Sequence, residues 1–311
     1  MSLRIARSPR LGSMALALVA AACSSDKVNS PTTGPVTKWV ITSLTLPTKT
    51  DSLGFDLNGD GRPDNALGYA FHLLGQAGID VQGTITMGVD SGALVQLLSF
   101  QSDDPALQND AAASAVWYAG QPSSGGLAGA HAIDGAQPAA TFTGALIGSA
   151  YASQNPATTS TPVSGVVQLS LYPGVPVMTL PLNGMHIQWS FQGTTQIVQG
   201  QINGSIRASD VDNVVIPQLT SALNATLSAD TASGTGRAIE SLFDTGGCGS
   251  AVAGDYVLDE CEVAGNALLS VVLQPDVQIY NTSGGYAPSA ANSTPNALSF
   301  GVAFTAAPTT F

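Results

Sequence analysis

The alternation of hydrophobic and polar residues predicts that most of this chain folds as antiparallel β-structure. Residues 38–46 (KWVITSLTL) form a β-type run that ends at Pro47. The alternation is clearest later in the chain, where Ile187, Trp189 and Phe191 lie on one face of a strand. From residue 93 onward, the predicted strands are residues 93–101, 114–120, 140–146, 163–172, 177–182, 185–192, 195–207 and 296–306.

Apolar residues spaced three and four apart predict helices in two other regions. Residues 66–89 have this helical period, and their glycines predict a kink or break near residues 75–78. Shorter helices are predicted over residues 214–227, 238–243 and 260–273. We therefore expect an α+β protein, which is predominantly an antiparallel β-sandwich or partial barrel with a few packed helices.

The beginning of the chain has the pattern of an export signal. Three arginines precede a short apolar segment, residues 14–22, that is well below the roughly 20 residues needed to span a bilayer. The small residues before Cys23 resemble the lipobox of bacterial lipoproteins, in which the cysteine is acylated and becomes the mature N-terminus. Two alternatives stay open, namely cleavage that leaves Cys23 free and retention of the segment as a membrane helix.

This signal defines the expected domain organisation and location. Acyl chains on one cysteine are enough for stable anchoring, so the sequence predicts a lipoprotein of the outer membrane, on either its periplasmic or its cell-surface face. The expected parts are a signal peptide (1–22), a tether (23–37) and a single secreted domain (38–311), which contains a β-rich core (93–207), a helical segment (209–275) and a closing strand (296–306).

The charge of the chain limits its partners. The sequence has 9 basic and 21 acidic residues and a formal net charge of −12. Between Pro63 and Phe311 the only arginines or lysines are Arg207 and Arg237. No phosphate-binding face can be built from so few cations, so the composition excludes nucleic acid as a partner and favours cations. The sequence does not identify a protein or glycan partner.

The remaining cysteines predict one disulfide. If Cys23 carries lipid, then Cys248 and Cys261 are an even pair in an exported protein, where disulfides form. A zinc site with two cysteine ligands is the alternative, although no histidine lies near either residue in the sequence.

Residues 56–64 (DLNGDGRPD) predict a calcium site. Oxygen-bearing side chains recur at Asp56, Asn58, Asp60 and Asp64, which are positions 1, 3, 5 and 9 of an EF-type loop, and the Arg62 carbonyl would be the ligand at position 7. Position 12 is a leucine instead of the usual bidentate glutamate, so the pattern is closer to dockerin-like loops. The alternative interpretation is a turn rich in local hydrogen bonds.

A second segment, residues 243–249 (FDTGGCG), resembles a decayed copy of this loop. Asp244 occupies position 1, but glycine and cysteine stand where ligands are needed at positions 3 and 5. We expect a disulfide between Cys248 and Cys261 to replace a cation there, linking the loop to the helix that follows it.

These motifs resemble those of a family of uncharacterised, myxobacterial-type outer-membrane lipoproteins. The shared features are the lipobox, the loop and helix start at residues 56–68, the second loop at residues 242–249 and the final strand at residues 296–306. The resemblance spans most of the mature chain and implies export and lipid anchoring. It implies no particular activity.

No catalytic motif stands out. His72, His131 and His186 are isolated in the sequence, and there is neither a G-x-S-x-G nor an H-E-x-x-H motif. The sequence therefore predicts a lipid-anchored, calcium-stabilised structural or adhesion protein without catalytic activity. The alternatives are a carrier that holds an apolar ligand in a β-cavity, which a large dry cavity would favour, and a secreted hydrolase, which a cleft with a paired histidine and carboxylate would favour.

Overall fold

The computed structural model describes residues 33–311 of the chain apart from residues 173, 230 and 250. The predicted signal peptide, Cys23 and most of the predicted tether lie outside the described residues. All of the described elements lie within one compact unit, Pro31–Phe311.

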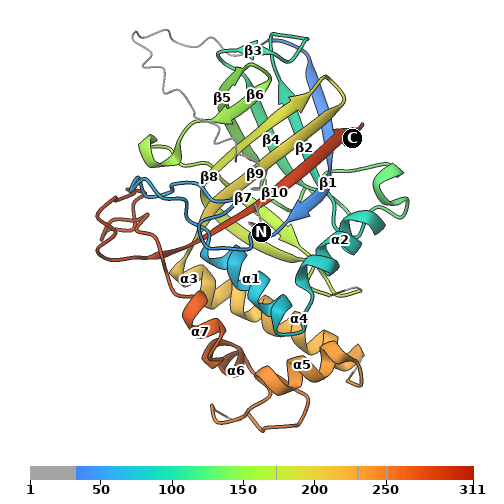
Figure 1. Ribbon diagram of the computed structural model, residues 1–311, viewed down its shortest axis with the longest axis vertical. Coiled ribbons are helices and arrows are strands. Elements are labelled where there is room, and N and C mark those ends of the chain that lie inside the picture. The colour runs from blue at the N-terminus through green and yellow to red at the C-terminus, as the bar shows by residue number, and fades with distance from the viewer. Residues whose placement is uncertain (1–32, 173, 230, 250) are drawn as a thin grey trace, which may run out of the picture. The chain divides into compact units, whose positions relative to one another are not determined.

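Eight of the strands form a closed antiparallel β-barrel (Figure 1). The ring runs in the order β5, β4, β2, β1, β10, β9, β8 and β6, and it closes where β6 pairs with β5. The additional strands β3 and β7 pair with β5 and β8 respectively. The strand bounds are β1 Val36–Thr45, β2 Gln96–Gln101, β3 Asn109–Asp110, β4 Ser114–Ala119, β5 Ala140–Ile147, β6 Ala150–Ser153, β7 Ser164–Leu169, β8 Met178–Gln192, β9 Gln196–Arg207 and β10 Ala297–Pro308.

This architecture matches the antiparallel, barrel-like part of the expectation, but no two-sheet sandwich is seen among the described residues. Closure depends on β6, a four-residue strand that the sequence pattern does not predict. Two segments predicted as separate strands are one continuous strand, β8. Gly184 is the reason, because its φ of 60° forms a bulge between Asn183 and His186 instead of a turn.

Aromatic side chains fill the barrel interior. Tyr151 on β6 and Trp189 on β8 have ring centroids 4.4 Å apart. The ring centroid of Phe100 on β2 lies 5.3 Å from that of Trp189 on β8. Since β2 and β8 are not neighbours in the sheet, this contact crosses the barrel interior. An eight-stranded barrel is just wide enough for side chains to fill it. The interior is therefore a packed core.

The helical region after the first loop is broken where the glycines predict. It forms α1, Ala66–Gln76, and α2, Val81–Ser91. Gly78 lies between them with a φ of 98°, which L-residues with a side chain rarely adopt. The Asp80 carboxylate then caps α2 by accepting the Gly83 N–H at 2.9 Å. α1 packs on β10, and α2 packs on β1.

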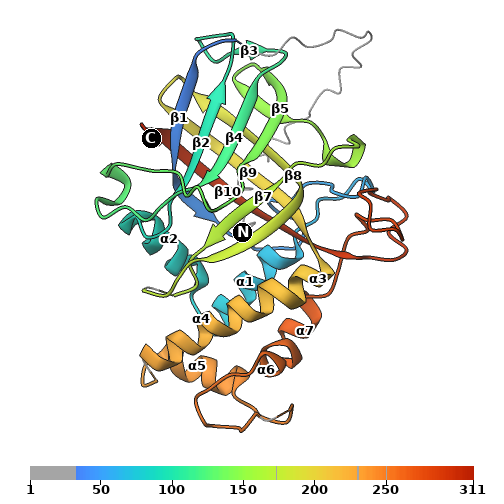
Figure 2. The same ribbon diagram turned by 180° about the vertical axis from the view of Figure 1, so that it is seen from behind.

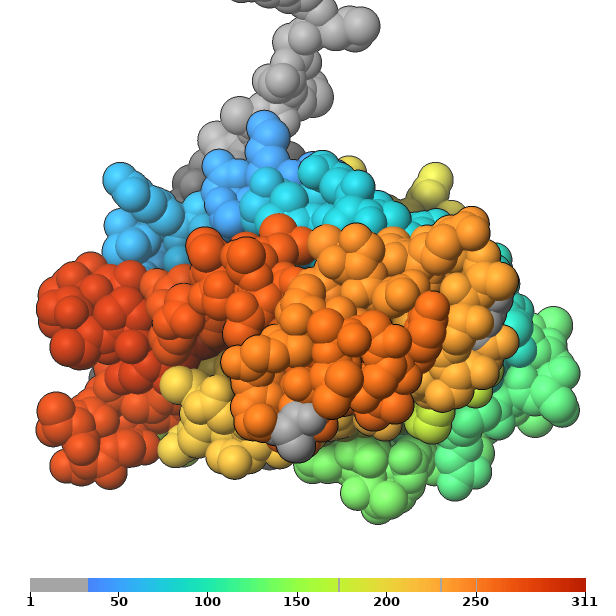
Figure 3. Space-filling view, turned by 90° about the horizontal axis from the view of Figure 1, so that it is seen from below, coloured from blue at the N-terminus to red at the C-terminus, as the bar shows by residue number. Residues whose placement is uncertain are grey.

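The remaining helices gather at one end of the barrel, as both ribbon views show (Figures 1 and 2). Seen from that end, residues of this helical segment form most of the surface (Figure 3). The predicted helix over residues 260–273 is divided into two, because the Asn266 side chain accepts the Leu268 and Leu269 N–H groups and starts a new helix. The bounds are α3 Ala208–Asp210, a π-helical turn Val211–Val215, α4 Ile216–Ala229, α5 Gly234–Phe243, α6 Glu260–Gly265 and α7 Leu269–Val272.

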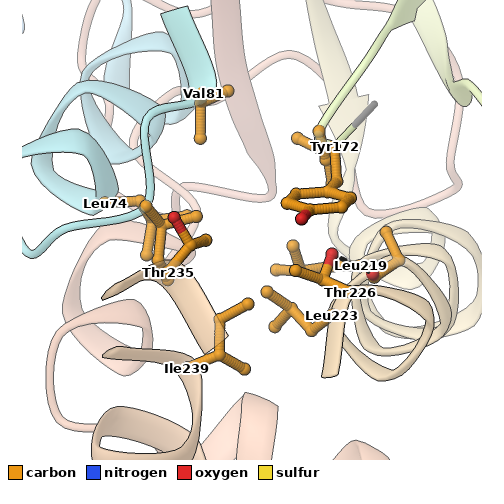
Figure 4. A pocket seen from close by; sticks show the side chains of 11 residues that line it. Leu74, Val81, Tyr172, Leu219, Leu223, Thr226, Thr235 and Ile239 are labelled. Carbon is orange, nitrogen blue, oxygen red and sulfur yellow. Dashed lines mark hydrogen bonds between the residues drawn. The ribbon is translucent and has the colours of Figure 1, made fainter. Parts of the chain in front are cut away.

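A small apolar cavity lies where α1, α4 and α5 meet (Figure 4). Leu74, Leu223 and Ile239 are among the side chains that line it, and its volume is about 10 Å³. That is barely the space that one water molecule needs, so the cavity is a packing gap between helices and offers no room for an organic ligand.

Candidate functional site

The predicted calcium loop lies between β1 and α1 and is closed at its base. Phe55 and Asp64 form an antiparallel bridge in which the Asp64 N–H donates to the Phe55 carbonyl at 2.9 Å. Phe55 and Leu57 belong to a small apolar cluster with Val277 and Ile279, from the segment before β10. The loop is thus attached to a part of the chain that is remote in sequence.

Asp56 organises the turn of this loop. Its Oδ1 accepts the N–H groups of Gly59 at 2.7 Å and Asp60 at 2.9 Å, and its Oδ2 accepts the Gly61 N–H at 2.9 Å. Gly59 and Gly61 have φ values of 86° and 87°, which let the backbone wrap around the carboxylate. One carboxylate at position 1 that accepts several N–H groups folds the backbone inward.

The next two oxygen-bearing side chains continue the pattern. The Asn58 Oδ1 accepts the Asp60 N–H at 3.0 Å, and the Asp60 Oδ1 accepts the Arg62 N–H at 2.9 Å. Asn58 is only 2% exposed although it is polar, and its amide nitrogen has no hydrogen-bond partner among the described residues. These contacts place the alternate side chains of the loop on its inner side.

Asp64, at position 9, lies where the loop meets the protein. Its Oδ2 accepts the Leu57 N–H at 2.9 Å. Burial raises the pKa of Asp64 to about 7, the hydrogen bond from Leu57 opposes this rise, and the negative charges of Asp276, Asp60 and Asp56 add to it. The ionised form is therefore costly here unless a cation is nearby.

Asp276 is a neighbour of the loop that sequence reasoning missed. Its carboxylate accepts the Ser299 N–H at 2.7 Å and the Ser299 hydroxyl at 2.5 Å. The same hydroxyl accepts the N–H of Ala66, the first residue of α1, at 2.8 Å. Burial also raises the pKa of Asp276. No local spacing signals its role, since only the fold brings it close to Asp64.

The donor chemistry of the loop fits a hard cation such as calcium. Carboxylate, amide and carbonyl oxygens are the ligands that calcium prefers, and the spacing of these residues is that of an EF-type loop. Leu67, at position 12, is fully buried in α1 and cannot be a ligand. In the described part of the chain, no group of three or more His, Cys, Asp or Glu side chains is already gathered in a metal-binding arrangement.

Hydrogen bonds to two carboxylates hold the second loop together. The Asp244 carboxylate accepts the N–H groups of Gly254 at 2.7 Å and Tyr256 at 2.8 Å. The Glu262 carboxylate accepts the N–H groups of Gly246 at 2.6 Å and Asp259 at 3.0 Å. Both carboxylates are buried and are bound by the protein's own N–H donors.

A disulfide joins Cys248 and Cys261 and links this loop to α6. The bond lies where the sequence pattern places a link between the second loop and the helix that follows. With the four hydrogen bonds to Asp244 and Glu262, it makes the segment a covalently closed structural loop.

His186 is the only histidine that contacts a potential nucleophile in the described part of the chain. Its Nδ1 lies 2.8 Å from the Ser153 hydroxyl and 3.0 Å from the Gln154 carbonyl. The Ser153 hydroxyl also accepts the Ile187 N–H at 3.0 Å, where the pairing of β6 with β8 ends. No carboxylate hydrogen-bonds to His186 among the described residues. The Ser153–His186 pair therefore fits a structural role, in which it satisfies hydrogen bonds where the pairing of β6 with β8 ends.

His72 and His131 make local contacts only. The Nε2 atom of His72 lies 3.0 Å from the side-chain amide of Gln76, one turn along α1. The Nε2 atom of His131 lies 3.3 Å from the Leu127 carbonyl. Neither contact contains a nucleophile or a carboxylate.

The search for relatives gives no further guide. No protein family, curated protein or solved structure shows significant similarity to this chain. None of the helices in the described part is long and apolar enough to cross a lipid bilayer. The functional argument therefore depends on the residues of the chain itself.

Proposed function

We propose that this chain is a lipid-anchored, calcium-stabilised β-barrel protein of the outer membrane, with a structural or adhesive role and without catalytic activity. The lipid on Cys23 would attach it to the membrane. The lipobox-like residues before Cys23 and the motifs at residues 56–68 and 296–306 resemble those of myxobacterial-type lipoproteins, which would imply the same location. Protein or glycan partners would contact the barrel and its loops.

The observation that carries the calcium part of this proposal is the folding of the loop around Asp56. Three backbone N–H groups point to that carboxylate, and the side chains of Asn58 and Asp60 follow at the alternating positions of an EF-type loop. Calcium would be held by Asp56, Asn58, Asp60 and Asp64 together with the Arg62 carbonyl. Water would complete the ligand set.

A cation would also remove an electrostatic cost at this position. Asp64 has a pKa of about 7 because it is buried and lies among Asp276, Asp60 and Asp56. Calcium would stabilise the ionised form and draw the loop and the Asp276 segment together. This supports a structural role for the ion, since Ala66, which follows the loop, and Asp276 both hydrogen-bond to Ser299 of the barrel strand β10.

The packed interior supports a structural role over carriage of an apolar ligand inside the barrel. The ring of Phe100 contacts Tyr151, Trp189 and Phe191 with centroid distances of 5.1–5.3 Å. Side chains therefore occupy the space in which a carrier would hold its ligand.

Thermal melting with and without calcium tests this function. For a site with a Kd on the order of 10⁻⁴ to 10⁻³ M, restoring about 10 mM calcium after EDTA treatment stabilises by roughly 1.4–2.7 kcal/mol, which raises the Tm by about 3–8 °C. The variant Asp60→Asn keeps the hydrogen-bond acceptor for Arg62 but loses the charge, so most of this rise should disappear.

Asp134→Asn is the matched control, because Asp134 is a partly exposed carboxylate that accepts a local N–H at 3.1 Å in a different loop. It should keep the full calcium response. A Tm of the unmodified protein that is unchanged by calcium, or an equal response in both variants, would show that the loop is a simple turn.

The anchor is tested separately. Mass spectrometry of the mature protein should find a diacylglyceryl group on Cys23, and Cys23→Ser should move the protein from the membrane fraction to the soluble fraction. A free Cys23 thiol in membrane-associated protein would refute the lipid anchor and leave the calcium site unaffected.

A further inference from the structure

A large open groove lies between α2 and the segment that connects β7 to β8. Its volume is about 990 Å³, at the upper end of the range of ligand pockets. It lies outside the barrel and apart from the calcium loop. Its lining comes from α2, from residues 93 and 122, and from residues 170–177, with residue 173 outside the description.

The walls of this groove are mainly apolar. Met87 is 52% exposed and lines the groove together with Val175 and Val177, which are partly buried. Ala93 and Pro122 extend the apolar lining. A flexible methionine at the rim suits an apolar chain of variable shape. An exposed surface of this kind is typical of a binding site.

The groove is built from segments that are fixed to one another. At Gly88 on α2, an added Cβ would lie 3.1 Å from the Cβ of Ser170, so glycine permits this close approach. At the end of α2, the Ser123 N–H donates to the Gly92 carbonyl at 2.8 Å. The shape of the groove is therefore set by packing on both sides of α2.

The charge of the lining indicates the head group of a ligand. Asp90 is the only charged residue among those that line the groove, and it is exposed. No lysine or arginine lines it in the described part of the chain. An amphiphile with a carboxylate or phosphate alone would be repelled, whereas an ammonium group would pair with Asp90.

We propose that this groove binds a single-chain amphiphile, with its apolar chain along Met87, Val175 and Val177 and an ammonium head group at Asp90. The exposed Ser91 and the buried Ser170 are the two hydroxyl side chains in the lining, and most of the other lining residues suit hydrocarbon. This binding function is separate from the calcium loop, and either can fail without the other.

Isothermal titration calorimetry tests this site with three probes that share one chain length, namely decylammonium, decanol and decanoate. The protein is the full chain with Cys23→Ser, and each probe is kept below its micelle concentration. Decylammonium should bind with one-to-one stoichiometry, about two- to fivefold more tightly than decanol at low salt, because an exposed ion pair contributes that much. Decanoate should bind more weakly than either.

Three variants assign the site. The double variant Met87→Gln/Val175→Gln should weaken decylammonium binding by at least about fivefold, since it removes apolar contacts at half-exposed positions. Asp90→Asn should bring decylammonium to the affinity of decanol. The matched control is Val271→Gln, because Val271 is 71% exposed on α7 and does not line the groove, and it should bind as the parent protein does.

Three outcomes would overturn the proposal. The first is the absence of decylammonium binding to a folded protein. The second is binding that the double variant leaves unchanged or that decanoate equals. The third is self-association in sedimentation velocity that the same double variant removes, which would assign the groove to a second copy of this chain.

Discussion

At the scale of single residues, His186 is a neutral side chain inside a charged protein. Burial lowers its pKa to about 4, and the hydrogen bond to the Gln154 carbonyl opposes this only in part. Its ring also packs edge-on against Phe55, with centroids 3.8 Å apart. The imidazole therefore connects the end of the β6–β8 pairing to the base of the calcium loop.

This burial predicts a specific acid sensitivity. The unfolded chain takes up the His186 proton near pH 6.5, but the folded protein does so only near pH 4, so its contribution to stability is full above about pH 6.5 and is lost as the pH falls toward 4. Relative to His186→Gln, the unmodified protein should lose up to about 3 kcal/mol of unfolding free energy between pH 7 and pH 4.

Urea unfolding of both proteins at several pH values measures this difference. The comparison with the variant is essential, because Asp64 also titrates in this range. Since the pKa of Asp64 is raised to about 7, its contribution to the unfolding free energy is lost as the pH rises through about 7, whereas that of His186 is lost as the pH falls. Both proteins contain Asp64, so its effect cancels in the difference between them. A difference between the two proteins that stays constant with pH would show that His186 is not buried as a neutral side chain.

At this scale, the sequence predicts side-chain contacts that are local, while the calcium ligands stay a prediction. Asp56, Asn58 and Asp60 are recognisable from their spacing, because the backbone turn that unites them is contained within a few residues. Asp276 and Ser153 could not be predicted in this way. Asp276 lies near Asp64, and Ser153 contacts His186, only because the tertiary structure brings these distant residues together.

At the scale of elements, the segment 51–65 is attached to the barrel through a close backbone approach. The Asn65 side chain donates to the Leu53 and Gly301 carbonyls at 3.1 and 3.0 Å, and it accepts the Gly301 N–H at 2.9 Å. Asn203 on β9 donates to the same Leu53 carbonyl at 2.7 Å. This network positions the loop of residues 56–64 on β10.

Gly301→Ala should break this attachment. A Cβ there would lie 1.7 Å from the Asn203 amide nitrogen and 2.5 Å from the Leu53 carbonyl oxygen, so the segment must move. We expect a loss of about 2–3 kcal/mol in unfolding free energy, measured with urea, and a weaker calcium response.

The matched control is Gly135→Ala, since a Cβ at Gly135 meets nothing within 4 Å. Its effect should stay within about 0.5 kcal/mol. Equal effects of the two substitutions would show that the approach of Gly301 to Asn203 and Leu53 does not stabilise the fold.

The types of most elements could be predicted from sequence, because their patterns are local. The glycines near residue 78 gave the break between α1 and α2. The errors occurred where tertiary contacts decide the outcome. Asn266 starts a new helix through side-chain hydrogen bonds, and β6 is too short to show an alternating pattern.

At the scale of the whole molecule, the barrel depends on pairings between remote parts of the chain. β10 lies between β1 and β9, with Trp39 opposite Pro308 and Ala297 opposite Arg207. The alternation along each strand predicts an antiparallel sheet. Closure could not be predicted, because it depends on the pairing of β5 with β6 and of β1 with β10.

A variant that ends at residue 296 should therefore fail to fold. Without β10, the strands β1 and β9 become exposed edges, and Trp117 and Trp189 lose their packing on Phe304. We expect no cooperative unfolding transition and solvent-exposed tryptophan fluorescence. A variant that ends at residue 308 keeps β10 and should retain a cooperative transition. Native-like fluorescence from the shorter variant would contradict this prediction.

The pairing of β1 with β10 also governs when this chain can fold. The strand at residues 36–45 can complete its pairing only after residues 297–308 have been synthesised. A closed barrel therefore cannot form until nearly the whole described sequence has been made. Such distant contacts slow folding. If the chain is exported as proposed, this delay would give it time to cross the membrane before the barrel closes.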